Sequence, residues 1–319
     1  MDVPASPGQP PHRWRFAAVD IGSNAVRLLV SDVLLKGKRV LIKENTRVRV
    51  PLRLGREAFE TGELSAGSCR DLVKTLGAFA TLTQLMGVDA TLACATAALR
   101  EAGNGSAIVK DIRAACGMDV RIISGTEEAD FIFSTYMTEL PFRRGAFLFF
   151  DIGGGSTEVA FYQGGSLQGA QSFPLGTVRM LSQGVPASLW AELRFWLQEQ
   201  AGRIRSGKWI GVGSGGNVKE LARLAAKKPV SLKRVESLRE QLGGTPLEQR
   251  AEKFGLTRER AEVIVPAAEI LAYILGCAGV DKLHVPNIGL LEGIVSRLFW
   301  ERQRPEALKQ RGHLEYRWT

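Results

Sequence analysis

The chain has 319 residues, 45% of them hydrophobic and 24% charged, which is typical of a globular protein large enough for two domains. Its formal net charge of +9 favours an anionic partner, yet no helix-turn-helix, zinc-finger or RNA-binding pattern accompanies the basic residues, so a nucleic-acid polymer is not expected. The four cysteines are widely spaced and only three histidines occur, which leaves acid-base and metal chemistry to carboxylates.

The first residues, 1–13, are rich in proline and small polar residues and are expected to form a disordered tail. They have neither the basic start nor the apolar centre of a secretory signal. No window is uninterrupted and apolar for the length that a bilayer crossing needs. We therefore expect a cytoplasmic protein without membrane contact.

The elements of the first half alternate between strands and helices. The predicted strands cover residues 15–20, 25–33, 40–50, 91–96 and 120–124. Apolar residues recur at steps of three and four between Leu64 and Met86, which predicts a helix. Further helices are predicted over 106–117 and 126–137. This order predicts an α/β domain.

The second half returns to the opening pattern. The segments AAVDIGSNAVRLLV and LFFDIGGGSTEVAFY each contain an apolar strand that ends in aspartate, then Ile-Gly, a small polar turn and another strand. Asp-Gly turns between strands are common, so chance is the alternative explanation. The shared aspartate, isoleucine and glycine favour duplication, and we predict two similar α/β domains that face each other.

The turn between Asp151 and Glu158 combines two chemical features. The run Gly153–Gly155 can point several backbone N–H groups at one anion, because no Cβ atom blocks the approach. The two carboxylates offer the hard oxygen ligands that Mg²⁺ takes beside bound phosphates. Taken alone, the same turn could also be an ordinary hairpin.

A further glycine run, Gly211–Gly216, follows a predicted strand and precedes a helix. It matches the spacing of a dinucleotide-binding loop, but no strand ending in an acidic residue lies about 20 residues further on. We interpret it instead as a loop that approaches phosphate groups.

Four motifs, DIGSNAVRLLV, ATAALREAGN, IISGTEEADFIF and DIGGGSTEVAFY, occur in the order that resembles the exopolyphosphatase and guanosine pentaphosphate phosphatase (Ppx/GppA) family of the actin-like ATPase superfamily. The resemblance extends from about Phe16 to the GVGSGGN segment and more faintly to the end. It implies an α/β fold of two ribonuclease-H-like domains, residues 14–124 and 125–293, with the active site in the interdomain cleft. The last residues, about 294–319, can pack back onto the first domain.

The resemblance also implies roles for individual residues. Glu128 resembles the catalytic glutamate that positions or deprotonates the attacking water, whereas Glu127 can cap its helix. Asp151 and Glu158 resemble the metal-binding pair, and Asp20 is a further candidate ligand. The implied substrate and phosphate contacts are Ser23, Asn24, Arg100, Gly153, Gly154, Gly155, Ser156, Gly213, Ser214 and Gly215.

Two segments do not follow the family pattern in a simple way. The usual Gly-Leu-Arg-Glu-Gly sequence is Gly289-Leu290-Leu291-Glu292-Gly293 here, so one basic contact is missing. The core Arg53-Leu54-Gly55 is retained within an unusual surround, and the sequence assigns it no role. The length resembles the short two-domain form of the family.

We therefore predict an exopolyphosphatase that uses Mg²⁺ or another divalent cation to release the terminal phosphate of inorganic polyphosphate. The alternatives are a guanosine pentaphosphate (pppGpp) 5'-phosphatase and a non-catalytic sensor of guanosine penta- or tetraphosphate or of polyphosphate. A kinase of the same superfamily would need a second substrate pocket and an adenosine site, and the SGTEEA motif disfavours it. Family members are often dimers, which implies a homodimer.

Overall fold

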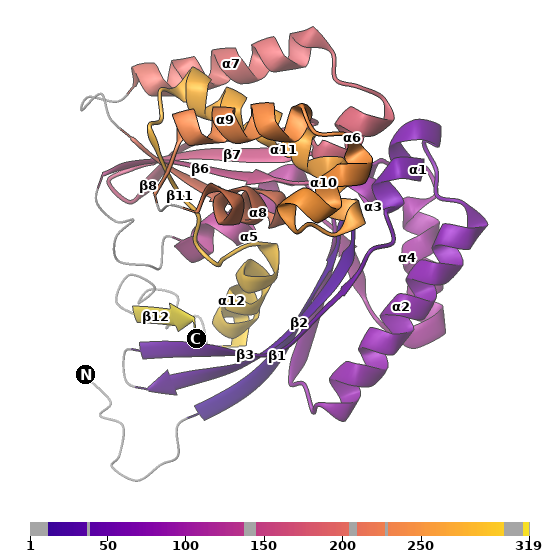
Figure 1. The fold of residues 1–319 in the computed structure, drawn as a ribbon. Helices are drawn as coiled ribbons and strands as arrows, with labels where there is room; N and C mark the ends of the chain where they lie inside the picture. Colours follow the sequence, from indigo (N-terminus) through magenta and orange to yellow (C-terminus); the bar gives the residue numbers. More distant parts are fainter. Residues whose placement is uncertain are drawn as a thin grey trace.

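A computed structural model of the chain describes residues 12–36, 39–136, 145–203, 209–226, 229–302 and 315–318. It contains two six-stranded mixed sheets with helices between and around them (Figure 1). Most of the predicted tail lies outside the described residues, and the first strand begins at His12, just inside the range 1–13.

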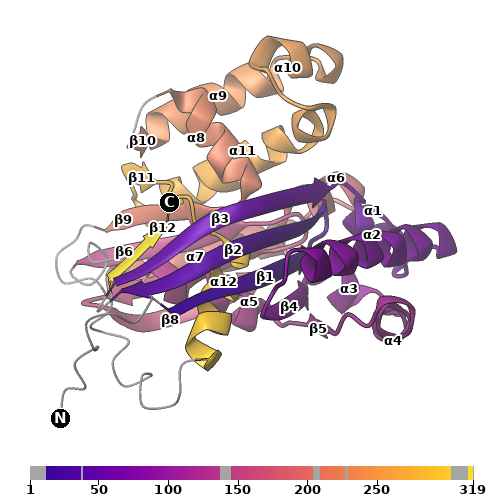
Figure 2. The ribbon, with the colours of Figure 1, turned by 90° about the horizontal axis from the view of Figure 1, so that it is seen from below.

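The first sheet has the strand order β12-β3-β2-β1-β4-β5. Its strands are β1 (His12–Ile21), β2 (Val26–Lys36), β3 (Arg39–Val50), β4 (Ala90–Ala95), β5 (Val120–Ile122) and β12 (Glu315–Trp318). Strands β1, β2 and β3 are antiparallel neighbours, whereas β4 runs parallel to β1 and β5 parallel to β4. β12 comes from the far end of the chain and pairs with β3 (Figure 2).

The second sheet has the strand order β10-β11-β9-β6-β7-β8. Its strands are β6 (Ala146–Ile152), β7 (Thr157–Gln163), β8 (Ser166–Phe173), β9 (Ile210–Ser214), β10 (Val230–Ser231) and β11 (Lys282–His284). The order β8-β7-β6-β9-β11 repeats β3-β2-β1-β4-β5, with antiparallel and parallel pairs in the same places. This repetition confirms the predicted pair of ribonuclease-H-like sheets.

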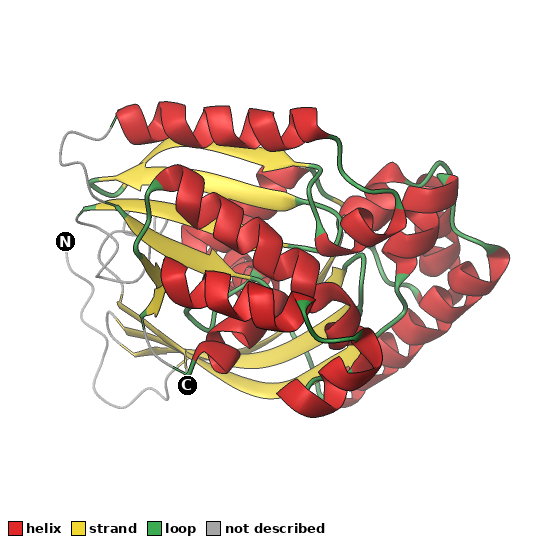
Figure 3. Cartoon of the chain, turned by 45° about the horizontal axis from the view of Figure 1, so that its top comes forward, coloured by secondary structure: helices red, strands yellow, loops and turns green. Residues whose placement is uncertain are grey.

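Most of the described helices pack outside the two sheets, some against a sheet face and others against neighbouring helices. Those of the first half are α1 (Leu54–Thr61), α2 (Ala66–Leu85), α3 (Ala97–Glu101) and α4 (Gly105–Cys116). Those of the second half are α6 (Thr177–Ser182), α7 (Ala187–Gly202), α8 (Gly216–Ala225), α9 (Leu232–Gly243), α10 (Leu247–Phe254) and α11 (Arg258–Ala278). Figure 3 shows several of the latter lying across the second sheet.

Two helices, α5 (Gly125–Tyr136) and α12 (Leu290–Arg302), lie between the sheets (Figure 1). One buried cluster joins Phe16 of β1, Ile132 of α5, Phe149 of β6 and Ile294 of α12. Burial of this apolar surface holds the two sheets against the central helices and supplies a large share of the stability of this layer. The rigid layer also fixes the N-terminus of α5, which carries Glu128.

Helix α11 contains a stretch long and apolar enough to cross a membrane, with a mean hydropathy of 1.7, although Glu262 and Glu269 interrupt it. Within the protein, 61% of that stretch is buried. The helix packs against α7, α8 and α9, so its apolar surface is accounted for by the core of the second half.

Candidate functional site

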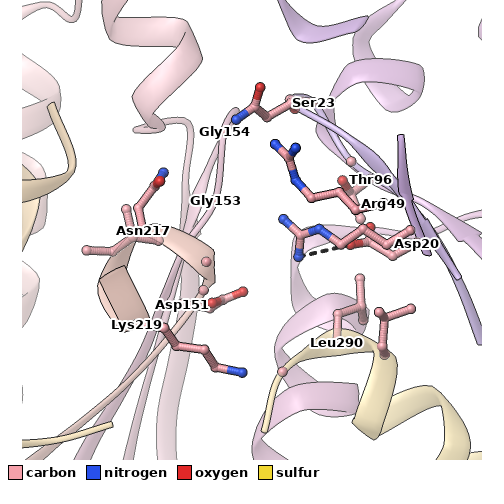
Figure 4. Close-up of a pocket in the computed structure, with 18 of the residues that line it drawn as sticks. Asp20, Ser23, Arg49, Thr96, Asp151, Gly153, Gly154, Asn217, Lys219 and Leu290 are labelled. Carbon is pink, nitrogen blue, oxygen red and sulfur yellow. Dashed lines mark ion pairs between the residues drawn. The ribbon is translucent and has the colours of Figure 1, made fainter. Parts of the chain in front are cut away.

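A cavity of about 560 Å³ opens between the two halves of the molecule (Figure 4). Residues from the ends of β1 and β6, and Gly215 directly after β9, line it together with residues of β2, β3, α8 and α12. Of the sequence-predicted site residues, those that line the cavity are Asp20, Ser23, Asn24, Glu128, Asp151, Gly153, Gly154, Gly155, Ser156 and Gly215.

The two hairpins place different partners beside their equivalent aspartates. Asp20 lies opposite Arg27 in the β1–β2 pair, and Asp151 lies opposite Glu158 in the β6–β7 pair. An Arg27 nitrogen approaches an Asp20 oxygen at 3.5 Å. The first hairpin therefore offsets its own negative charge, whereas the second concentrates it.

Three buried carboxylates, Glu128, Asp151 and Glu158, each offer an oxygen within 4.8 Å of the others. Glu158 Oε1 accepts hydrogen bonds from Ser156 (2.7 Å) and Ser172 (2.9 Å), and Asp151 Oδ1 accepts one from Ser214 (2.7 Å). In contrast, Oε2 of Glu128 and Oε2 of Glu158 accept no hydrogen bond from the described residues although both atoms are buried. Three converging carboxylates with two unsatisfied oxygens fit a divalent cation that takes oxygen ligands.

Burial is the main reason why the carboxyl groups at this cavity have raised pKa values. It raises the pKa of Glu158 to about 7 and that of Asp20 to about 6. It also raises the pKa of Glu128 well above its ordinary value, and the neighbouring charges of Glu158 and Asp151 act in the same direction. A bound cation would favour the charged forms and bring these pKa values down.

The turn Gly153–Ser156 presents free backbone donors. The carbonyl groups of its three glycines accept hydrogen bonds from α6 or Arg179, so they are held away from the cavity. The N–H groups of Gly154, Gly155 and Ser156 donate to none of the described residues, and all three residues line the cavity. Three consecutive unpaired donors form the anion cradle that the sequence predicted for this turn.

The same glycines also allow the two halves to touch. A Cβ atom on Gly154 would lie 2.9 Å from Ser23 Cβ, and one on Gly155 would lie 2.5 Å from Phe59 Cζ. Both distances are too short for real contacts. Glycine is therefore required here for a second reason, the close approach of the first half to the turn.

The segment Arg53-Leu54-Gly55, to which the sequence assigned no role, supports the opposite loop. Gly55 N–H donates to Ser23 O at 2.8 Å, and Arg53 N–H donates to Asn24 O at 3.1 Å. Arg53 has a left-handed φ of 56°, an uncommon conformation for a residue with a side chain. These bonds hold Ser23 and Asn24 at the cavity wall.

Arg100 and Glu127 lie beside the carboxylate cluster. Arg100 donates to Ile123 O at 2.9 Å, and the same nitrogen lies 3.7 Å from Glu128 Oε2. Glu127 caps α5 as predicted, because its carboxylate accepts from Ser124 N–H (3.0 Å) and its own N–H donates to the Ser124 hydroxyl (3.1 Å). Glu128 is left to face the cavity.

The third glycine run divides into two parts. Gly213 and Ser214 lie in β9 behind the cavity wall, where a Cβ atom on Gly213 would meet Phe150 at 2.8 Å and the Ser214 hydroxyl bonds Asp151. Gly215 lines the cavity with a φ of +95°, and a Cβ atom there would lie 2.8 Å from Asp151 Oδ1. Of the three, Gly215 alone is placed to meet a ligand.

The sequence analysis missed the cationic part of the site. The cavity is also lined by Arg27, Arg47, Arg49, Lys219 and Arg260. The alternation Arg47-Val48-Arg49 within a predicted strand was a usable signal, because residues two apart share one face of a sheet. Lys219 and Arg260 lie on helices whose orientation only the tertiary structure defines.

Leu291, which replaces the usual arginine, is 3% exposed and belongs to the apolar cluster between the sheets. The neighbouring Glu292 accepts a hydrogen bond from Arg47 at 2.6 Å. A guanidinium from β3 therefore lies beside the segment that lacks its own arginine.

The comparisons with known proteins agree with this architecture. The model of the Ppx/GppA phosphatase family matches residues 35–300. The chain is 26% identical over 304 residues to exopolyphosphatase 1 of Mycobacterium leprae, with 89% of each chain covered.

Two solved structures share the fold. An exopolyphosphatase from Cytophaga hutchinsonii aligns with a TM-score of 0.78 at 21% identity, over 90% of this chain and 98% of that chain. A Ppx/GppA family member from Aquifex aeolicus aligns with a TM-score of 0.73 at 23% identity, over 92% of this chain and 100% of that chain. With a family match over most of its length and the repeated pair of sheets, this chain belongs to the Ppx/GppA phosphatase family.

Proposed function

We propose that this protein is an exopolyphosphatase, which hydrolyses the terminal phosphoanhydride bond of inorganic polyphosphate and releases orthophosphate. The observation that carries the proposal is the buried carboxylate cluster beside three unpaired backbone N–H groups. Phosphoryl transfer needs mainly an oriented nucleophile and neutralised charge, and this arrangement offers both. The exopolyphosphatase name of the Mycobacterium leprae relative points to the same activity.

In the proposed mechanism, Glu128 orients the attacking water and accepts its proton. Its raised pKa makes it a stronger base than an ordinary glutamate, and its Oε2 accepts no hydrogen bond from the described residues. Asp151 and Glu158 would hold a divalent cation, for which we propose Mg²⁺, and that ion would neutralise charge on the phosphate oxygens. The N–H groups of Gly154, Gly155 and Ser156 would bind the terminal phosphate, and Arg100 would approach it from beside Glu128.

Polyphosphate fits the cavity better than pppGpp. The described lining contains glycines, carboxylates and cations but no aromatic side chain on which a guanine could stack. A non-catalytic sensor is disfavoured because Glu128, Asp151 and Glu158 are brought together. We also propose, from the family resemblance, that the protein is cytoplasmic and homodimeric.

The test compares phosphate release from long-chain polyphosphate and from pppGpp, with and without Mg²⁺. We expect release from polyphosphate only with the metal, and a loss of roughly 10²–10⁴-fold in Glu128→Gln. Glu127→Gln is the matched control: Glu127 serves the cap of α5, glutamine can keep that cap, and we expect little change in stability or activity. Binding of polyphosphate without any phosphate release would instead identify a sensor.

A further inference from the structure

Arg49 is the one guanidinium lining the cavity that has no hydrogen-bond or ion-pair partner among the described residues. The other three are held: Arg27 by Asp20, Arg47 by Glu44 and Glu292, and Arg260 by Glu220 and Gly216 O. An arginine that points into a cavity without a carboxylate partner is available to an anionic ligand.

Arg49 also lies in a row of charges across the first sheet. Asp20 is opposite Arg27 in the β1–β2 pair, and Arg27 is opposite Arg49 in the β2–β3 pair. Two like charges directly opposite each other destabilise a sheet. Arg49 is exposed to solvent, and partial desolvation together with the charges of Arg27 and Arg260 lowers its pKa against an opposing effect of Glu259.

The residues of the second sheet that are equivalent to Asp20, Arg27 and Arg49 include no cation. Asp151 is opposite Glu158, and Glu158 is opposite Ser172. Figure 4 shows Arg49 and Asp20 on one side of the cavity and Asp151 and Lys219 on the other. The duplicated fold therefore sets a cationic row against the carboxylates of the hydrolytic site.

Arg49 comes from a different strand than Asp20 but lines the same cavity. It lies two strands from Asp20, which corresponds to about 10 Å at the usual strand spacing. A chain of linked phosphates is long enough to contact Arg49 while its terminal phosphate lies at Gly153–Ser156.

We propose that Arg49 is a specificity-determining residue that binds a phosphate group of the polyphosphate chain other than the one removed, and so favours long chains. The inference rests on the proposed exopolyphosphatase function. The Gly289–Gly293 segment, in which Leu291 lines the cavity without a charge, supplies no cation of its own.

The test measures kcat and KM of Arg49→Gln and Arg49→Lys with long-chain polyphosphate and with tripolyphosphate. In Arg49→Gln we expect KM for the long chain to rise about tenfold with kcat changed less than threefold. The effect on tripolyphosphate should be smaller, because fewer phosphates extend beyond the cleaved bond. Arg49→Lys should restore part of the affinity, since it keeps the charge but loses the planar fork.

The matched control is Arg56→Gln, an exposed arginine on α1 that pairs with Glu60 outside the cavity. Thermal unfolding of Arg49→Gln should be unchanged or shifted upward, because the substitution removes repulsion from Arg27. An unchanged KM for both substrates, or an equal rise for both, would overturn the role of Arg49 in chain-length preference.

A direct binding measurement distinguishes failure of the proposed exopolyphosphatase function from failure of the proposed Arg49 contact. Equilibrium titration of long-chain polyphosphate into Glu128→Gln, with and without Arg49→Gln, measures binding in the absence of turnover. Weaker binding in the double variant supports the Arg49 contact even if the parent chain releases no phosphate. Equal affinities with and without Arg49→Gln would reject it.

Discussion

At the scale of single residues, the Gly153–Ser156 turn meets two requirements at once. The N–H groups of Gly154, Gly155 and Ser156 donate to none of the described residues, and Gly154 and Gly155 lie against Ser23 and Phe59 of the first half. Either requirement alone favours glycine, and together they exclude a side chain at Gly155. The phosphate cradle and the contact between the two halves are the same few atoms.

Gly155→Ala is expected to disturb both the phosphate cradle and the contact between the two halves. The added Cβ would lie 2.5 Å from Phe59 Cζ and 2.6 Å from Ala97 Cβ, so the halves must separate locally. We expect a loss of about 1–3 kcal/mol in the free energy of unfolding and a fall in activity of roughly 10²-fold. Urea unfolding and phosphate release measure the two effects.

The control is Gly77→Ala in α2, where the nearest atom to the new Cβ is at 3.9 Å. Alanine is the better helix former, so this variant should be as stable as the parent chain or more stable. Full activity in Gly155→Ala would show that the close approach of the two halves is not needed for function.

At the scale of elements, the contact between α5 and α12 positions the candidate base. Glu128 lies in the first turn of α5, and Tyr136 at its last turn donates to Ile288 O at 3.0 Å. Where the helices cross, a Cβ atom on Gly293 would lie 2.2 Å from Phe131 O. The small residue allows α12 to approach the backbone of α5.

Gly293→Ala should therefore displace α5 and its carboxylate. We expect unfolding to become easier by about 1–3 kcal/mol, and activity to fall although position 293 does not line the cavity. Gly276→Ala on α11, where a Cβ atom meets nothing within 4 Å, serves as the control. Lower stability with an unchanged kcat would show that the contact between α5 and α12 does not position Glu128.

At the scale of the whole molecule, the cost of burying the carboxylates should be visible in the pH dependence of stability. Glu158 has a pKa of about 7 in the folded protein against an ordinary value of 4.5, and the pKa of Glu128 is raised too. Between about pH 4.5 and about pH 7, the folded state thus binds more protons than the unfolded state. Stability must fall as the pH rises through this window.

For the metal-free protein we expect the free energy of unfolding to decrease from about pH 4.5 to about pH 7, by roughly 3 kcal/mol from Glu158 alone. Excess Mg²⁺ should remove or reverse the slope, because it binds the deprotonated carboxylates. Urea titrations at several pH values, with and without the metal, measure this. Glu158→Gln should flatten the metal-free slope, and a metal-free stability that rises with pH would contradict the prediction.

The sequence alone determined the two hairpins and their duplication. Strand periodicity and the repeated Asp-Ile-Gly turn predicted both hairpins, because alternation and turn chemistry are local properties of the chain. The spacing of Asp151 and Glu158 also predicted that they would meet, since a short turn aligns them across two strands. The helix cap at Glu127 was equally local.

The tertiary structure decided which side chains come together at the cavity. Glu128 reaches Asp151 only because α5 packs between the sheets, and Arg49 faces them only because the two halves close around the cleft. The role of Arg53-Leu54-Gly55 depends on a loop about 30 residues earlier in the chain. Such contacts join residues distant in sequence, and local spacing carries no information about them; they are set by which apolar faces bury each other.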